Sequence, residues 1–150
     1  MGLYQCLYIL DMKISDHFNI EELVPKAIFE QYGARSKWFI DPQLIVAIEW
    51  IRTRYGKAMT INNWSNGGSF QNRGFRTPHT TVGARLSQHK FGRAADFNIE
   101  GMTSQDIFDD LVGISEQLPF TTIENVAYTP TWTHIDTRWT GGDSLLIVAP

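Results

Sequence analysis

The sequence predicts an α+β fold, and three patterns support this class. Segments 21–32, 41–56 and 103–118 carry the apolar spacing and the terminal residues of helices. Segment 93–99 alternates apolar and polar side chains, as a half-buried strand does. Segments 121–127 and 132–137 are typical of two strands joined by a turn around Thr129 and Pro130.

The first two helices are defined by the residues at their ends. Pro25 is expected in the first turn of helix 21–32, because proline lacks the N–H that later turns need, and Gly33 is expected to end this helix. Asp41 is a good N-cap for the second helix, and Gly56 is a C-terminal stop. The buried face of the second helix is formed by Leu44, Ile48, Ile51 and Tyr55.

A short strand is expected at 58–62, followed by the long irregular segment 63–88. This segment is rich in Gly, Asn, Ser, Thr and Arg, and it has no sustained period. Long irregular segments inside a compact domain are usually functional when they are ordered. Because the segment leads directly into His89, we expect it to frame one side of a cleft.

Strands 93–99 and 132–137 each have an apolar and a polar face. In the first strand, Asp96 lies on the face opposite to the apolar side chains Ala95, Phe97 and Ile99. In the second, the period of two places Trp132, His134 and Asp136 together on one face. Each strand can therefore cover a core with one face and line an open site with the other.

The helix between these strands begins at a capping box. Thr103 is the expected N-cap, and Asp106 stands where a Glu is more usual. Pro119 is expected to end the helix. Its buried stripe is formed by Ile107, Leu111, Ile114 and Leu118.

Two histidines and one aspartate on these segments make the ligand set of an open metal site. His89, Asp96 and His134 supply two imidazoles and a carboxylate, and leave a position where a water can be activated. Two ligands of one zinc ion must lie within about 4 Å of each other, whereas seven extended residues span roughly 23 Å. The chain must therefore turn back between His89 and Asp96, and Gly92 is the residue that most easily permits this turn.

The motifs around these residues resemble a known family. Residues Ser87, His89, Gly92, Ala94 and Asp96, followed by the run Trp132-Thr133-His134-Ile135-Asp136, resemble the zinc D-alanyl-D-alanine carboxypeptidase family and its relatives. These relatives include phage peptidoglycan endopeptidases and the hedgehog signalling domain. The upstream run Gly74-Phe75-Arg76-Thr77-Pro78 is similar to the Gly-Tyr-Arg-Ser-Pro segment of the cell-wall members. The resemblance covers roughly residues 14–138.

The resemblance implies a function for each matched residue. It implies that zinc is bound by His89, Asp96 and His134. It also implies that Ser87 and Arg76 line the substrate site, where Arg76 would stabilise the oxyanion or bind a substrate carboxylate. Taken alone, Arg76 would be a solvated loop residue and Ser87 a local turn or cap.

The general base departs from the family pattern. Many relatives have Glu or Asp three residues before the last histidine ligand, where this chain has Thr131. Asp136 is the first candidate to replace it, because it shares a strand face with His134, and Glu124 on the neighbouring strand is the second. Two other roles for Asp136 remain open: a carboxylate that orients the ligand histidine, or an ion-pair partner of Arg138.

Pattern and resemblance together predict a small, mainly antiparallel sheet of the hedgehog and DD-peptidase type. The sheet is expected to carry the metal on its open face, with three helices packed elsewhere. We expect a single zinc peptidase-like domain over residues 1–150, in which residues 1–13 are an extension outside the core. The apolar walls of the site are expected from Trp132, Trp64 and Phe91.

Composition excludes several other classes of protein. The chain is 43% hydrophobic and 19% charged, which is typical of a folded globular protein. With a net charge of −3 and no basic run, no nucleic-acid partner is expected, and no apolar run approaches the ~20 residues that membrane insertion needs. The single cysteine, Cys6, excludes an intrachain disulfide. His17 and His79 are expected to be ordinary surface or core histidines.

The expected function is zinc-dependent hydrolysis of peptide bonds in peptidoglycan stem peptides, of endolysin or carboxypeptidase type. The alternative is a zinc-stabilised binding module, or a phage structural module, that keeps the fold without the activity. Residues 1–10 lack the features of a signal peptide. We therefore expect a soluble monomer, cytoplasmic at synthesis, that acts on the cell wall after release.

Overall fold

The computed structural model describes residues 11–150 of the chain. Residues 1–10, which include Cys6 and the segment tested for a signal peptide, lie outside the described part. The described chain forms helices α2 (Lys26–Tyr32), α3 (Pro42–Tyr55) and α4 (Ser104–Gly113). Its strands are β1 (Met59–Thr60), β2 (Ala94–Ile99), β3 (Thr122–Glu124), β4 (Thr133–Asp136) and β5 (Leu146–Val148). The predicted α+β class is confirmed.

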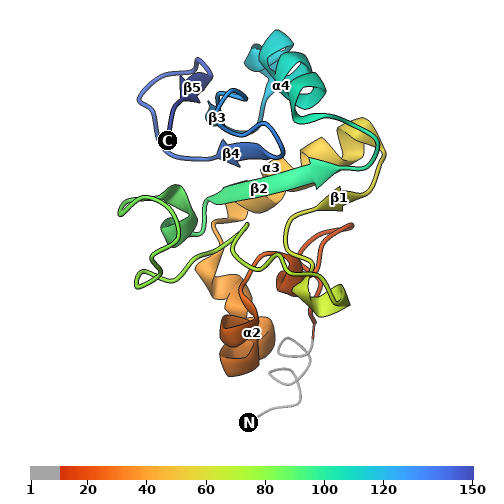
Figure 1. Cartoon of the computed structure of the whole chain (residues 1–150), viewed down its shortest axis with the longest axis vertical. Helices are drawn as coiled ribbons and strands as arrows, with labels where there is room; N and C mark the ends of the chain where they lie inside the picture. Colours follow the sequence, from red (N-terminus) through yellow and green to blue (C-terminus); the bar gives the residue numbers. More distant parts are fainter. Residues whose placement is uncertain (1–10) are drawn as a thin grey trace.

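The strands form one sheet in the order β1-β2-β4-β3-β5 (Figure 1). The pairings β1–β2, β2–β4 and β4–β3 are antiparallel, as expected, and β5 pairs with β3 in parallel. Strand β5 was not predicted from the sequence. This strand has only three residues, Leu146 and Ile147 are exposed, and its pairing with β3 comes from a distant part of the chain.

One face of the sheet packs against α3, which lies behind the sheet in Figure 1. Leu44, Ile48 and Ile51 of α3 are fully buried, which confirms the apolar face predicted for this helix. They join a core cluster to which the sheet contributes Ala95, Phe97, Ile99, Ile123 and Ile135. Since side chains alternate along a strand, Asp96 and His134 point to the other face. The core thus fixes which residues face the site.

The helix ends follow the predicted capping residues for α3 and α4. The Asp41 carboxylate accepts a hydrogen bond from the Gln43 backbone N–H, and Gly56 ends α3 at φ 60°. Thr103 and Asp106 form the predicted capping box at the start of α4. This helix ends at Gly113 rather than near residue 118, and a short 3-10 turn, Ser115–Gln117, follows.

The prediction of one continuous helix over 21–32 was wrong. A 3-10 turn, Ile20–Glu22, is separated from α2 by an extended Pro25 with ψ 152°, which is the N-cap of α2. The Leu23 carbonyl accepts from the Phe75 backbone N–H instead of closing a helical turn. The predicted extension 1–13 is also too long, because Met12 packs against the core and Lys13 pairs with Asn19.

No helix between residues 11 and 150 is long and apolar enough to cross a membrane.

The segment 63–88 is irregular apart from one 3-10 turn, Trp64–Asn66, and the start of a second, Gln88–Phe91. The second turn contains His89 and is followed closely by β2. The predicted loop system therefore leads into the site.

Candidate metal centre

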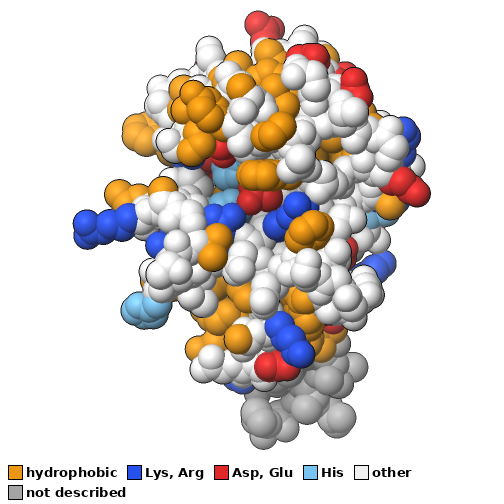
Figure 2. All heavy atoms as spheres, viewed as in Figure 1, with side chains coloured by type: hydrophobic (Ala, Val, Ile, Leu, Met, Phe, Trp, Pro, Cys, Tyr) orange, Lys and Arg blue, Asp and Glu red, His pale blue; other side chains and the backbone are white. Residues whose placement is uncertain are grey.

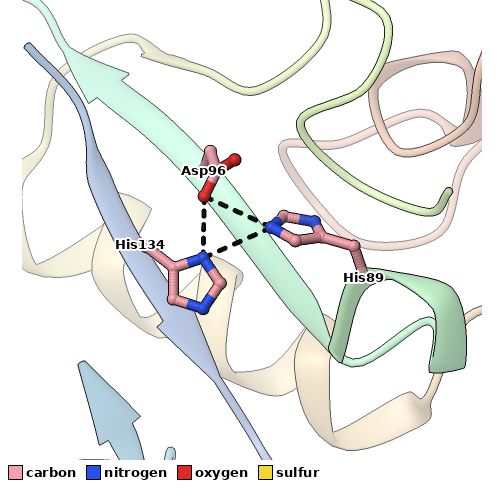
Figure 3. Close-up of side chains that lie close together, drawn as sticks. All are labelled: His89, Asp96 and His134. Atoms are coloured by element: carbon pink, nitrogen blue, oxygen red, sulfur yellow. Dashed lines mark hydrogen bonds and ion pairs between the residues drawn. The ribbon is translucent and has the colours of Figure 1, made fainter. Parts of the chain in front are cut away.

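Three buried side chains converge on the open face of the sheet (Figure 3). The Asp96 Oδ1 atom lies 2.8 Å from His134 Nδ1 and 3.3 Å from His89 Nε2, and the two nitrogens lie 3.3 Å apart. Ligands bound tetrahedrally to zinc at 2.0–2.1 Å are separated by about 3.3 Å. The triangle of donor atoms therefore fits a metal ion of this size with little rearrangement.

Strand pairing brings two of the three candidate ligands together. Asp96 of β2 is directly opposite His134 of β4 in the antiparallel register. Directly opposite residues on one face of such a pair have Cβ atoms about 5 Å apart, so their side chains meet. His89 comes from the 3-10 turn Gln88–Phe91, and Gly92 at φ 69° turns the chain back into β2. This confirms the turn predicted at Gly92.

Each candidate ligand is oriented by a second hydrogen bond that points away from the triangle. His89 Nδ1 lies 2.7 Å from the Gly74 carbonyl oxygen, which can only accept, so Nδ1 donates and Nε2 faces the triangle. His134 Nε2 lies 3.3 Å from Asp136 Oδ2, which leaves Nδ1 facing inward. Arg76 Nη2 donates to Asp96 Oδ2 at 2.9 Å. Outer partners of this kind are what a metal site uses to aim its ligands.

The protonation of the group follows from burial and from its charges. Burial lowers the pKa of His89. Burial also acts to lower the pKa of His134, but the carboxylates of Asp136 and Asp96 outweigh it and raise that pKa to about 9. The neighbouring histidines outweigh the burial of Asp96 and hold its pKa below the usual range. Without a metal ion, His134 therefore carries a proton between its Nδ1 atom and Asp96.

Metal binding is expected to strengthen as the pH rises toward 9, because a metal ion must displace the proton on His134. The apparent affinity should increase about tenfold per pH unit up to that pKa, measured by competition with a chelator of known affinity. In the metal-free protein, the stability of the fold depends on pH in the opposite direction. Because the pKa of His134 is raised from 6.5 to about 9, its protonation stabilises the fold fully below pH 6.5, and this stabilisation is lost as the pH rises through 9. An affinity that does not change between pH 7 and 8.5 would contradict a protonated His134.

Two features require a glycine at position 92: its left-handed backbone conformation and the close approach of the Phe39 carbonyl oxygen. Its φ is +69°, and a Cβ atom added there would lie 1.8 Å from the Phe39 carbonyl oxygen. We expect Gly92→Ala to lose metal binding and to cost more stability than the ~1–2 kcal/mol of left-handed strain alone. Gly56→Ala is the matched control, because Gly56 has φ +60° and no atom within 4 Å of the added Cβ. Equal destabilisation of the two variants in chemical denaturation, with metal binding retained, would contradict this account.

A cavity of about 420 Å³ opens beside the three ligand residues. Figure 2 shows imidazole atoms at the bottom of a hollow near the middle of this face, with acidic and basic side chains beside them. The wall includes Arg76, Ser87 and Trp132, the three residues expected to contact substrate. A second hollow of about 260 Å³ adjoins it and shares Arg76, Asp96 and Trp132. Of the three candidate ligands, Asp96 lines both hollows.

The two candidate bases occupy different surroundings. Asp136 is fully buried, and both of its oxygens accept hydrogen bonds from the Arg138 side chain. Glu124 lines the cavity together with His89 and His134, and no hydrogen bond to its carboxylate occurs among residues 11–150. Burial raises the pKa of Glu124, and the nearby carboxylates act in the same direction. Glu124 therefore faces the open space, whereas Asp136 is enclosed.

Several residues named from the sequence lie elsewhere. Trp64 donates to the Val24 carbonyl at 2.9 Å and Phe91 is half exposed, and neither lines the cavity, so these two predicted walls were wrong. His17 pairs with Glu49 of α3. His79 is exposed in the loop.

The cavity also contains residues that the sequence analysis missed. Arg138 lines it, as do Tyr128 and the C-terminal residues Val148, Ala149 and Pro150. Arg138 follows Asp136 at the spacing of a strand face, and this spacing is the signal that would have revealed it. The Gly74 carbonyl had no such signal, because a backbone acceptor leaves no trace in residue type.

We compared the chain with family models, curated proteins and solved structures. None of them matches it.

Proposed function

We propose that the protein is a zinc-dependent peptidase that hydrolyses peptide bonds of peptidoglycan stem peptides. The observation that carries the proposal is the convergence of three potential ligand atoms, His89 Nε2, His134 Nδ1 and Asp96 Oδ1, at the wall of a cavity. Two imidazoles and one carboxylate, with a fourth position open to solvent, are a ligand set of catalytic zinc. The choice of peptidoglycan rests on the motif resemblance.

The fold supports the same proposal. A mainly antiparallel sheet with the ligands on its open face and α3 on the other is what we expect of the hedgehog and DD-peptidase type. The two hollows that Asp96 lines give room for a peptide chain beside the proposed ligands. A bound zinc ion would polarise the scissile carbonyl and lower the pKa of water to about 7.

We assign the general base to Glu124. Its carboxylate faces the cavity with its pKa raised by burial, which suits a group that takes a proton from water and returns it to the leaving amine. The sequence favoured Asp136, with Glu124 second. Three hydrogen bonds from Arg138 to the fully buried Asp136 carboxylate favour the reverse order. In this proposal Asp136 orients His134, and Arg76 orients Asp96.

The test is hydrolysis of purified peptidoglycan by the zinc-loaded protein. The protein should release new amino groups, this release should stop after chelation, and it should resume when zinc is restored. Mass spectrometry of the released peptides identifies the bond that is cut. His134→Ala should abolish the signal, whereas His79→Ala, which removes an exposed histidine from the loop, should leave it unchanged.

A non-catalytic module of the same fold is the second candidate, and one observation favours it. Thr131, at the position where many relatives carry the acid, is exposed, and its carbonyl accepts a hydrogen bond from Asn98. A zinc-loaded protein that leaves peptidoglycan intact, while His134→Ala only lowers its melting temperature, would support a zinc-stabilised binding or structural role.

A further inference from the structure

The guanidinium of Arg138 is held rigidly on one edge. Its Nε donates to Asp136 Oδ1 at 2.8 Å and its Nη2 donates to Oδ2 at 2.5 Å. The Arg138 backbone N–H donates to the same Oδ1 atom at 3.1 Å. A two-point pair between a guanidinium and a buried carboxylate fixes the plane of the arginine. Arg138 is therefore oriented before any ligand arrives.

The other edge of this guanidinium has no hydrogen-bond partner within residues 11–150. The Arg138 side chain is 32% exposed and lines the cavity with Glu124 and the ligand residues. Its Nη1 atom donates no hydrogen bond to any group within residues 11–150. A guanidinium has donors on both edges, and the carboxylate of Asp136 occupies only one of them. Both hydrogens of Nη1 therefore remain free for a ligand.

Arg76, the other arginine of the cavity, is already occupied. Its Nη2 donates to Asp96, its Nε donates to the Asn72 carbonyl at 2.6 Å, and its side chain is only 10% exposed. Its Nη1 lies against Gly83, where an added Cβ would come within 2.5 Å of it. The role of binding a substrate carboxylate, expected for Arg76 from the family resemblance, therefore suits Arg138 better.

The charge of the loaded cavity favours an anion. The charged side chains that line it are Arg76, Arg138, Asp96 and Glu124, and the buried carboxylate of Asp136 lies behind them against Arg138. Two positive and three negative charges give −1, and a divalent metal ion changes the sum to +1. A neutral or cationic ligand gains nothing from this field, whereas a carboxylate does.

We propose that Arg138 binds a carboxylate of the substrate within about three residues of the bond that is cut. Arg138 Nη2 lies 2.5 Å from Asp136 Oδ2, which in turn lies 3.3 Å from His134 Nε2. The guanidinium is therefore within about 10 Å of a metal ion bound to His134. One extended residue spans about 3.3–3.6 Å. The carboxylate is either the C-terminal group or an acidic side chain. This inference rests on the proposed function for the identity of the substrate.

The test uses a peptidoglycan pentapeptide and two versions of it, one amidated at the C-terminus and one amidated at the side-chain carboxyl. Wild-type, zinc-loaded protein should prefer the free acid over one of the amides by about tenfold or more in kcat/KM and in Kd. The amide that loses affinity identifies the source of the carboxylate. Arg138→Met should remove this preference, while Arg35→Met, a change at an exposed arginine, should not.

Arg138→Lys keeps the positive charge but lacks the planar guanidinium with its several donors. This variant replaces Arg138→Met in the test if the methionine variant does not fold. It should retain zinc and show a reduced preference. The assignment of Arg138 would be overturned if the wild type showed equal kcat/KM and Kd for the free acid and both amides, or bound none of the three peptides. If the protein cleaves the free acid and both amides equally well, the assignment of Arg138 is rejected but the peptidase proposal stands. If it binds the free acid preferentially but cleaves no peptide, only the peptidase proposal is rejected.

Discussion

Asp96→Asn is expected to abolish metal binding and to lower the free energy of unfolding by about 3–5 kcal/mol. Asp96 is the common counter-ion of three groups, since Oδ1 contacts both histidines and Oδ2 accepts from Arg76. Its side chain is only 10% exposed, so water cannot replace it. Removing the charge leaves Arg76 buried without its partner and removes one of three ligands.

The measurement for this variant is chemical denaturation of the metal-free protein together with the metal content after loading. Asp143→Asn is the matched control, because it makes the same chemical change at an exposed carboxylate with no ion pair within residues 11–150. A variant at Asp96 that binds metal as tightly as the wild type would show that the carboxylate is not a ligand.

Glu124→Gln is expected to lower kcat by about 10²–10⁴-fold and to leave the metal content unchanged. The amide cannot accept a proton from water, and Glu124 makes no hydrogen bond to the three ligand residues that its replacement would disturb. Its raised pKa also assists the return of the proton to the leaving amine. The measurement is kcat on a soluble stem peptide at saturating zinc.

Asp136→Asn provides the contrast for this prediction. The change weakens the hydrogen bond that orients His134, so metal affinity should fall about 10–100-fold, with turnover largely restored by excess zinc. The opposite pattern, in which Asp136→Asn is inactive with zinc bound and Glu124→Gln is active, would return the role of general base to Asp136.

Local chemistry explains which parts of the fold were predictable. Helix α3 was predicted at both ends because Asp41 and Gly56 act within the helix itself. The start of α2 was not, because the Leu23 carbonyl is used by Phe75, far away in sequence. Strand β5 depends on pairing with β3 and carries no buried alternating pattern of its own. Long-range hydrogen bonds decided both of these cases.

The same distinction applies to the site. The group His89, Asp96 and His134 was predictable, because strand alternation and a glycine turn put their side chains on one face. What surrounds them was predictable only in part. The spacing of Asp136 and Arg138 allowed an ion pair, which the structure contains, but not the exposure of Arg138 to the cavity. Only the structure shows that the carboxylate of Glu124 lines the cavity whereas that of Asp136 is buried.

The most direct test of the metal centre is anomalous diffraction from crystals of the zinc-loaded protein, recorded at the zinc absorption edge. We expect one strong peak about 2.0–2.2 Å from His89 Nε2, His134 Nδ1 and Asp96 Oδ1, with the fourth position toward the cavity. A peak elsewhere, or no peak at these three atoms in a crystal of loaded protein, would contradict it.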